Sequence, residues 1–360
     1  VTVFTEARVV NVQGFIGKFK VGIDTGTGVK TIDIGVIVVA VGGVPFVPHG
    51  MYGYDGKTVM TQFEFEHRLK QGLDPEIKNI VMIQCVGGRN EERPYCSRIC
   101  CQTAVKNAML AKDHTPDANV FILYRDMQMY GIENEEMFRI SKAKGIRYIH
   151  YDPATPPEAA SHKVNVYHSL LGKDMELPAD LVVLSTPLVA HEDVGETSRL
   201  LRVPVDENGF FLEGHVKLKP LDFATDGVFL CGSARFPSNI RETVAQGLGA
   251  AARSSIPLSK GSVEVEPIIS VLADEDACRG CGLCVALCPY GALEIEQTQK
   301  GRKVHVIDVA CKGCGVCAAT CYQHALTINS FTDDQIDAQI DAFLGELNGC
   351  LLYTSPSPRD

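Results

Sequence analysis

Two cysteine runs near the end of the chain constrain its fold more than any other feature. Each run has the spacing C-x2-C-x2-C-x3-C, and every cysteine of the second lies 33 positions after its counterpart in the first, so the runs form an internal repeat. This spacing suits two cubane iron–sulfur clusters, because three thiolates of a tight loop wrap one cluster while the fourth reaches the sister cluster. The predicted ligand sets are Cys278, Cys281, Cys284 and Cys321 for the first cluster, and Cys311, Cys314, Cys317 and Cys288 for the second.

Other interpretations of these eight cysteines fit less well. Structural zinc sites use two CxxC pairs separated by a longer loop, whereas here three cysteines fall within seven residues, twice. Disulfides fit less well still. Pro289 closes the first run as it does in bacterial ferredoxins. We therefore predict a bacterial-type α+β ferredoxin domain with two [4Fe-4S] clusters over residues 278–331, followed by an amphipathic helix over residues 332–349 that docks on this domain or, as the alternative, on a partner.

Charge and hydropathy exclude several classes of partner. The net charge of −10 and the pI near 5.5 argue against nucleic acid and anionic membranes as partners. The longest apolar run, residues 34–47, is broken by Gly42, Gly43 and Pro45 and is too short to span a bilayer. Most of the fourteen cysteines stand in cluster spacing, which indicates a reducing compartment, and we expect the cytoplasm of an anaerobe.

The two ends of the sequence look unlike the ends of a natural protein. Val1 is not an initiator and enters what reads as the middle of a domain, so we expect an upstream portion. Residues 350–360 look like the translation of a sequencing-library adapter, and we exclude them, with Cys350, from fold reasoning.

The first 200 residues predict an α/β fold. Residues 1–10, 15–23 and 31–41 alternate as strands, and the last of these delivers Gly42 and Gly43 at its carboxyl end, where open α/β sheets bind nucleotides. A plain buried strand with a tight turn is the alternative. Farther on, strands and helices alternate in the manner of a doubly wound sheet. We predict strands at 79–84, 118–124, 146–151, 164–170 and 181–185, and helices at 61–70, 95–112 and 133–144.

A second glycine-bearing strand follows farther along the chain. Residues 226–232 read as a strand that ends on Gly232 and Ser233, and a helix then runs from Asn239 and Ile240, capped by Ser238, to residue 253. Its small residues allow close packing against a sheet, with or without a cofactor. Residues 254–277 read as a linker, and Cys231 reads as a buried structural cysteine.

A third group of cysteines, Cys85, Cys96, Cys100 and Cys101, lies in the α/β region. Cys85 stands where a dinucleotide fingerprint would place its first glycine, so that fingerprint is broken. The other three gather at the start of the predicted helix 95–112, where the helix N-terminus favours thiolates. Buried packing cysteines and a redox-active Cys100–Cys101 dithiol are the alternatives, but a third cluster fits the spacing best.

Several motifs together resemble one family over residues 1–349, the A subunits of heterodisulfide reductase. They are Gln84-Cys85-Val-Gly-Gly-Arg, Tyr95-Cys96-Ser-Arg-Ile-Cys100-Cys101 with Lys106, Tyr124-Arg-Asp126-Met, Gly227-Val-Phe-Leu with Ile240, Thr243-Val-Ala-Gln246, and the two ferredoxin runs. The resemblance implies a thioredoxin-reductase-like flavoprotein with two dinucleotide-binding domains, lacking its N-terminal part. It also implies a methanogenesis enzyme, an oxidoreductase subunit linked to flavin-based electron bifurcation, with the disulfide chemistry on a partner subunit.

The resemblance also assigns cofactors and partners. FAD would lie in a domain made of residues 1–78 and 196–253, and the inserted domain, residues 79–195, would carry a [4Fe-4S] cluster on the third cysteine group in place of NAD(P). The residues that would border FAD are Gly42, Gly43, Gly232, Ser233, Asn239 and Ile240, with Lys106 near the flavin ring. The implied partners are other heterodisulfide reductase subunits, a hydrogenase or formate dehydrogenase, and ferredoxin, with a homodimer inside a larger complex.

Two other functions compete with this one. A NAD(P)H-dependent disulfide reductase would use Cys100 and Cys101 and needs the nicotinamide site that the broken fingerprint argues against. A non-enzymatic, ferredoxin-like carrier would have no flavin. Metal content of the third cysteine group separates the first of these from an iron–sulfur flavoprotein.

Overall fold

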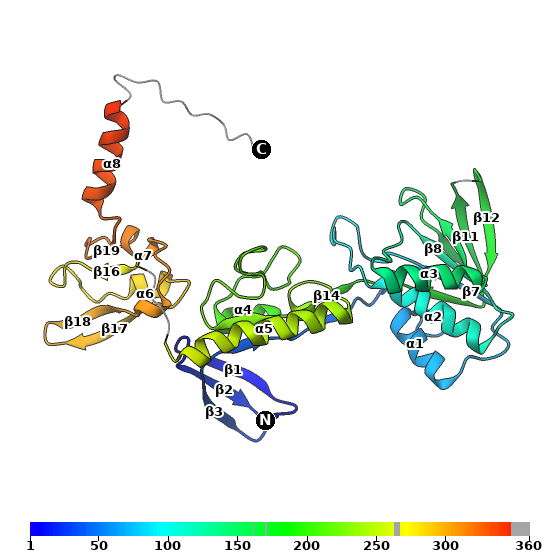
Figure 1. Ribbon diagram of the computed structural model, residues 1–360, viewed down its shortest axis with the longest axis horizontal. Coiled ribbons are helices and arrows are strands. Elements are labelled where there is room, and N and C mark those ends of the chain that lie inside the picture. The colour runs from blue at the N-terminus through cyan, green and yellow to red at the C-terminus, as the bar shows by residue number, and fades with distance from the viewer. Residues whose placement is uncertain (161, 170, 263–266, 347–360) are drawn as a thin grey trace.

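The structure is a computed structural model that describes residues 1–160, 162–169, 171–262 and 267–346. Three units follow one another along its long axis (Figure 1): an α/β unit over residues 51–185, a central unit over residues 1–50 and 186–262, and a cysteine-rich unit over residues 267–331. The predicted α/β fold class with a C-terminal ferredoxin-type domain is confirmed. Among the described residues, no helix combines the length and the apolar character that crossing a membrane requires.

A five-stranded parallel sheet forms the middle of the α/β unit. Its strand order is β6 (Val59–Thr61), β13 (Leu181–Leu184), β7 (Asn79–Ile83), β8 (Asn119–Tyr124) and β9 (Arg147–His150). Since β6 pairs with β13, this unit begins before residue 59, and the boundary predicted at residues 78 and 79 is wrong. The boundary at the other end is also earlier than residue 195, because residues 188–190 already pair with a strand of the central unit.

The two faces of this sheet bury different cores because neighbouring side chains of a strand point to opposite faces. Ile80 and Met82 of β7 join a core under the helices, while Val81 and Ile83 join a core on the opposite face. The helices are α1 (Gln62–Gln71), α2 (Cys100–His114) and α3 (Ile132–Ala143). Thr61 and Glu64 form a capping box that begins α1.

A small antiparallel sheet packs on the opposite face. It consists of β10 (Glu158–Ala160), β11 (Lys163–His168) and β12 (Lys173–Pro178). The prediction that residues 164–170 continue the main sheet is therefore wrong, and residue 170 itself lies outside the described residues. Periodicity shows that Val164 and Val166 are buried, but it does not show with which strand they pair.

The central unit is built from three small sheets. They are an antiparallel sheet of β1 (Arg8–Gln13), β2 (Phe19–Asp24) and β3 (Val29–Ile34), a parallel pair of β4 (Ile37–Val39) and β15 (Val228–Leu230), and an antiparallel pair of β5 (Gly43–Pro45) and β14 (Leu188–Ala190). A short helix α4 (Val194–Leu201) and a 3-10 turn η1 (Gly232–Ala234) complete it.

The strand predicted over residues 31–41 is divided into β3 and β4. Gly35 interrupts it: its carbonyl accepts from the amide of Gly17 at 2.8 Å, and Ile37 then donates to the carbonyl of Gly227. The chain thereby leaves one sheet and joins another. A Cβ atom on Gly35 would lie 2.6 Å from Cδ2 of Leu258, so a larger residue there would have to displace this side chain of the long helix that ends the unit.

That helix, α5 (Ile240–Lys260), is longer than predicted. Asn239 and Glu242 form its capping box, so Ser238 is not its cap. It continues past residue 253 to Gly261, a left-handed C-cap, so the first part of the predicted linker 254–277 is helix. Only Ala250 and Ser254 of α5 are buried, whereas Ile240 is 83% exposed.

The cysteine-rich unit shows its internal repeat in the folded chain. It contains β16 (Ser270–Leu272) paired with β19 (Leu326–Ile328), the hairpin β17 (Leu293–Thr298) with β18 (Gly301–Val306), the 3-10 turn η2 (Asp308–Ala310), and the short helices α6 (Leu283–Leu287) and α7 (Val316–Ala319). Gly282 and Gly315, one repeat apart, are the left-handed N-caps of the two helices. Because β16 lies inside residues 254–277, that part of the predicted linker is wrong too.

The last described helix, α8 (Asp333–Glu346), extends away from the cysteine-rich unit (Figure 1). Thr332 and Gln335 cap it reciprocally. Its apolar residues Ile336, Ile340 and Phe343 are exposed, so the prediction that this face docks on the ferredoxin unit is wrong. The end of the predicted helix 332–349 and the segment 350–360 lie outside the described residues.

Candidate metal centres and cofactor site

The eight cysteines of the repeat line two separate recesses, four to each. One recess is lined by Cys278, Cys281, Cys284 and Cys321, and the other by Cys288, Cys311, Cys314 and Cys317. In both, three cysteines come from one loop and the fourth comes from the other half of the repeat. The structure therefore brings together the two crossed sets that the spacing predicts.

Glycines let the two cysteine loops run close to neighbouring backbone. Gly280 has φ +61°, and a Cβ atom there would lie 2.3 Å from the carbonyl oxygen of Arg302. Gly313 has φ +62°, and its Cβ atom would lie 2.4 Å from the carbonyl oxygen of Ile268. Both the left-handed conformation and the close approach exclude larger residues at these positions.

Backbone amides point at sulfur in the second recess. The amide of Ser270 donates to Sγ of Cys311, and that of Ala292 donates to Sγ of Cys288, both at 3.3 Å. Burial raises the pKa of Cys284 and of Cys317, which disfavours isolated thiolates. Iron supplies the positive charge that such thiolates need, and amide donors to sulfur are typical around iron–sulfur clusters. The donor sets of both recesses thus fit a [4Fe-4S] cluster.

The third group of cysteines also lines a single recess, which contains about 380 Å³ of empty space including its mouth. Cys85 follows the end of β7, Cys96 lies in the loop before α2, and Cys100 and Cys101 form the first turn of α2. The predicted helix start at residue 95 is wrong, since α2 begins at Cys100. Arg98 causes the delay, because its φ of +61° is incompatible with a right-handed helix.

Strained residues shape the loops around this recess. Cys85 and Arg89 also have positive φ, +61° and +56°. Arg89 is held by an ion pair with Asp126, 2.7 Å between Nη2 and Oδ2, and its carbonyl accepts from Arg125 at 3.0 Å. Such strain in residues other than glycine concentrates at functional sites, where the surroundings must hold it in place.

Protonation of these cysteines argues against a dithiol reductase. Burial raises the pKa of Cys101 to about 11, and it raises the pKa of Cys100 still further and that of Cys85 as well. A catalytic dithiol needs a thiolate near neutral pH. Guanidinium groups stand nearby instead, with Nη1 of Arg89 at 3.9 Å from Sγ of Cys85, and they would compensate the charge of a thiolate-bound cluster.

A buried amide that sequence reasoning missed supports the same fit. Gln84 lines the recess beside Cys85 and is fully buried. Among the described residues, neither polar atom of its side chain has a hydrogen-bond partner. An amide that is unsatisfied in this way fits a recess that holds a sulfur-rich group. The sequence signal was a glutamine directly after the apolar residues 80–83 of a buried strand.

The glycines predicted to border FAD meet at one edge of the central unit. β4 and β15 are parallel and in register, so the segments that follow them leave at the same edge. Gly42 and Gly43 follow β4, and Gly232 and Ser233 follow β15; a Cβ atom on Gly43 would lie 3.6 Å from the carbonyl oxygen of Ser233. Such an edge is where open α/β sheets bind nucleotides, and these residues fit a dinucleotide cofactor.

The remaining predicted cofactor residues divide into two groups. Asn239 and Ile240 begin α5 near this edge, since Thr243 of its first turn would contact a Cβ atom on Gly232 at 3.1 Å. Lys106 instead forms an ion pair with Glu66 of α1, 2.6 Å between Nζ and Oε2. This partner lies inside the α/β unit, and approach of Lys106 to a flavin stays a prediction.

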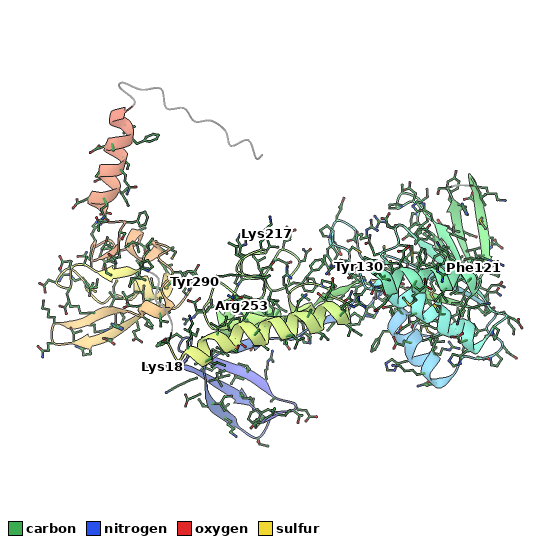
Figure 2. All side chains as sticks on the ribbon, viewed as in Figure 1. Lys18, Phe121, Tyr130, Lys217, Arg253 and Tyr290 are labelled. Carbon is green, nitrogen blue, oxygen red and sulfur yellow. The ribbon has the colours of Figure 1, made fainter. Side chains whose placement is uncertain are left out.

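Two residues of the α/β unit, Arg98 at the third recess and Tyr130, are bonded to the start of α5 and the residues just before it. The amide of Arg98 donates to Sγ of Cys96 at 3.3 Å, while its guanidinium donates to the carbonyl of Pro237 and to Glu242. Tyr130 donates to Glu242 and accepts from Asn239, and Figure 2 shows it at the junction of the two units. The cysteine loop is therefore fixed directly to the segment predicted to border FAD.

Comparison with known proteins gives three results. Residues 277–325 match the family model of a 4Fe-4S dicluster domain. The chain is 42% identical over 334 residues to the A subunit of the H(2):CoB-CoM heterodisulfide,ferredoxin reductase of Methanothermobacter marburgensis, covering 88% of this chain and 50% of that protein. It is 38% identical over 333 residues to the A subunit of the H(2)/formate:CoB-CoM heterodisulfide,ferredoxin reductase of Methanococcus maripaludis, covering 87% and 50%.

Among solved structures, thioredoxin reductase of Lactococcus lactis is similar with a TM-score of 0.47 and 16% identity, over 71% of this chain and 75% of that one. No functional conclusion follows from a likeness of that degree. The chain spans about half the length of the curated relatives that it matches.

Proposed function

Because this chain belongs to the family of heterodisulfide reductase A subunits, we propose that it is an electron-transfer subunit that passes electrons between an FAD site and [4Fe-4S] clusters. One observation carries the proposal: twelve cysteines gather in three recesses of four. When bound, a flavin exchanges electrons in pairs and each cluster takes one at a time, so the combination converts pair transfer to single transfer.

The chain's own residues would hold these groups and keep them in order. The cysteine loops wrap the clusters, and backbone amides such as those of Ser270 and Arg98 donate to the sulfurs. Gly42, Gly43, Gly232 and Ser233, with Asn239 and Ile240 at the start of α5, would border FAD. The contact of Arg98 with Glu242 supports a short path between the third cluster and the flavin.

The second cluster of the ferredoxin-type unit would be the inner one. Lys312, beside Cys311, forms an ion pair with Asp226 of the central unit. The carbonyl of Tyr290, close to Cys288, accepts from Arg202 of the same unit at 3.4 Å. Because Lys312 and Tyr290 both line the recess of the second cluster, that cluster would face the flavin unit, leaving the first to face an external partner.

The names of the relatives imply a complex with other subunits. We propose that other heterodisulfide reductase subunits carry the disulfide chemistry. A hydrogenase or a formate dehydrogenase would deliver electrons, ferredoxin would be a further partner, and the complex would contain a homodimer of this subunit in the cytoplasm. Electron bifurcation at FAD is part of the same proposal.

Iron and acid-labile sulfide per chain test the proposal after anaerobic reconstitution. Three cubanes require about 12 iron atoms and two require about 8. We expect about 12 in the wild type, about 8 in a Cys96→Ser, Cys100→Ser double variant, and about 12 in the control Cys231→Ser, because Cys231 lies at the end of β15 outside the three recesses.

A different result would redirect the interpretation. If the wild type and the double variant both hold about 8 iron atoms, the third group is a thiol site or packing. The dithiol-reductase hypothesis would then lead, in spite of the raised pKa values of Cys100 and Cys101.

A further inference from the structure

The side chain of Gln84 is buried under α2 without the partners that its chemistry demands. Ile80 and Met82 of β7 face the helices, and the alternation of a strand places Gln84 on the same face. It is 0% exposed, and within the described chain its Nε2 and Oε1 atoms make no hydrogen bond. A buried polar group without a hydrogen-bond partner destabilises the fold, so a role for it is expected.

The backbone of Gln84 is fully used, which fixes where the side chain can go. Its amide donates to the carbonyl of Leu123 at 2.9 Å, and its carbonyl accepts from the hydroxyl of Tyr151 at 2.7 Å. The residue lines the recess together with Cys85, Cys96, Cys100 and Cys101. The amide is therefore held at the wall of the recess that the third cluster would fill.

We propose that the carboxamide of Gln84 donates hydrogen bonds to the sulfur atoms of the third cluster, and thereby positions the cluster and favours its reduced form. The proposal rests on the proposed function, since it needs the cluster. Cluster sulfurs only accept hydrogen bonds, and the NH2 group of a carboxamide only donates. On reduction one electron enters the cluster and no atom or proton leaves, so the sulfurs become more negative and bind a donor more strongly.

Gln84 would then be the neutral donor on the sheet side of the recess. Arg89 approaches Sγ of Cys85 at 3.9 Å, and the amide of Arg98 donates to Sγ of Cys96. These two donors come from the loops, whereas Gln84 directly follows the buried strand β7 and its amide is still bonded to Leu123 of β8. Rigid elements position a donor more accurately than loops do. Removal of Gln84 should therefore affect this cluster and leave the two clusters of the cysteine-rich unit unchanged.

The test is a redox titration of the reconstituted full chain, followed by electron paramagnetic resonance, with iron content measured on the same samples. In Gln84→Leu, a shape-similar side chain without donors, we expect about 12 iron atoms. At the wild-type midpoint of the third cluster, the ratio of reduced to oxidised cluster should fall about threefold, a part of what one hydrogen bond contributes. Gln84→Glu, which replaces donors with a carboxylate, should lower the ratio further.

Gln62→Leu is the matched control. Gln62 is a buried amide on the same side of the sheet, but it donates to Ser185 at 3.1 Å and does not line the recess. It should leave the potential of the third cluster unchanged and lower the thermal midpoint of the iron-free chain. Gln84→Leu should not lower that midpoint, because it removes an amide that has no partner among the described residues.

The outcomes separate the two proposals. Wild-type chain with about 8 iron atoms would overturn the third cluster, and the role of Gln84 with it. About 12 iron atoms with an unchanged potential in both Gln84 variants would overturn the role of Gln84 alone. Loss of the third cluster from Gln84→Leu, with the thermal midpoint of the iron-free chain preserved, would support the positioning role.

Discussion

The cysteine-rich unit and the α/β unit both place sets of four cysteines around a recess, but the cysteines contribute differently to the hydrophobic cores of the two units. In the cysteine-rich unit the cysteines are part of the core: Cys278 and Cys317 are buried in it, and Cys284, Cys288 and Cys321 pack against it. In the α/β unit the two cores consist mainly of isoleucine, leucine, valine and methionine, and Cys101 is the one cysteine in their described members.

Size explains the difference. A unit as small as residues 267–331 buries too little apolar surface to be stable by packing alone, and small domains commonly add metals. The α/β unit surrounds its sheet with helices on one face and a second sheet on the other. We therefore expect cluster binding and folding to be one process in the first unit, and the α/β unit to fold without its third group of cysteines binding metal.

Of the changes considered, removal of iron should alter amide hydrogen exchange most, and it should affect the cysteine-rich unit far more than the α/β unit. After chelation under reducing conditions, we expect the hairpin β17–β18 to exchange its amide hydrogens within about tenfold of an unfolded chain, because its unit loses its core. Strands β7 and β8 should keep at least about 1000-fold protection. Hydrogen exchange with mass spectrometry measures both in one sample, with the reconstituted chain as control.

Equal protection of the two units after chelation would contradict this distinction. If the hairpin stayed protected, the apolar residues Leu293, Val304 and Leu326 would suffice as a core. If β7 and β8 lost protection as well, the third cluster would be structural rather than added to a finished fold.

Glycine substitutions should give the next largest effect and test how closely the cysteine loops are fitted. In Gly280→Ala, the new Cβ atom would lie 2.3 Å from the carbonyl of Arg302 and φ would stay at +61°. The loop must shift, and we expect loss of the first cluster, about 4 iron atoms per chain. Gly301→Ala, in the turn of the hairpin, is the control: its φ is +98°, no described atom apart from its chain neighbours lies within 4 Å of the new Cβ, and it lines neither recess.

The control should cost about 1–2 kcal/mol of conformational strain and keep its iron. Full iron in Gly280→Ala would show that the loop moves freely. The cysteine-rich unit would then differ from the α/β unit in the composition of its core and not in how tightly its cysteine loops pack.

The same contrast explains what could be predicted from the sequence. In the repeat, spacing fixes the chemistry, and the two crossed sets of cysteines line two recesses as predicted. In the α/β unit, the four cysteines line one recess and their role as cluster ligands stays a prediction, whereas the predicted start of α2 is wrong, since it begins at Cys100. It depends on the left-handed conformation of Arg98, which residues other than glycine adopt only where their surroundings hold them there.

Other predictions are wrong because they depend on contacts between residues far apart in the sequence, which local patterns do not contain. The break between β3 and β4 depends on hydrogen bonds of Gly35 and Ile37 to Gly17 and Gly227, and the separate sheet of β11 depends on pairing that apolar alternation does not specify. Gln84 was seen only as part of a motif. The inference that Gln84 contacts the third cluster depends on the burial of its side chain and on the absence of hydrogen-bond partners for that side chain within the described chain.

A smaller effect should follow from cutting the contact between the third recess and the central unit. Arg98→Gln removes the guanidinium bonds to Pro237 and Glu242, the residue that also caps α5. We expect the amides of residues 242–244 to exchange about tenfold faster, with iron content unchanged. The matched control is Arg241→Gln, which breaks an exposed ion pair with Glu133 at the same junction and should change exchange about twofold or less.

If the two arginine variants accelerated hydrogen exchange equally, the junction would respond to the loss of positive charge and not to the hydrogen bonds of Arg98 with Pro237 and Glu242. A loss of iron in Arg98→Gln would show instead that the loop needs its anchor on α5 to hold the cluster. The α/β unit would then be unable to hold the third cluster without its contact to the central unit.

The smallest expected effect is on the thermal stability of the α/β unit, from hydrogen bonds in a loop outside the three recesses. Asp55, before β6, accepts hydrogen bonds from the amides of Lys57, Thr58 and Val59. The bond from Val59 is the main cause that holds the pKa of Asp55 well below its usual range. Its contribution is therefore present above the unfolded pKa of about 3.9 and is lost as pH falls through the lower folded value.

Asp55→Asn should lower the thermal midpoint of the iron-free α/β unit at pH 7 by about 2 °C or less, because the site is exposed. The difference from the wild type should shrink below about pH 4, where the Asp55 carboxylate of the unfolded chain begins to protonate while that of the folded chain stays ionised. Asp152→Asn, at a residue that accepts one backbone amide, that of Ala154, is the control and should change less. An Asp55→Asn difference that is the same at pH 3 and pH 7 would mean that the geometry of the side chain, and not its charge, stabilises this loop.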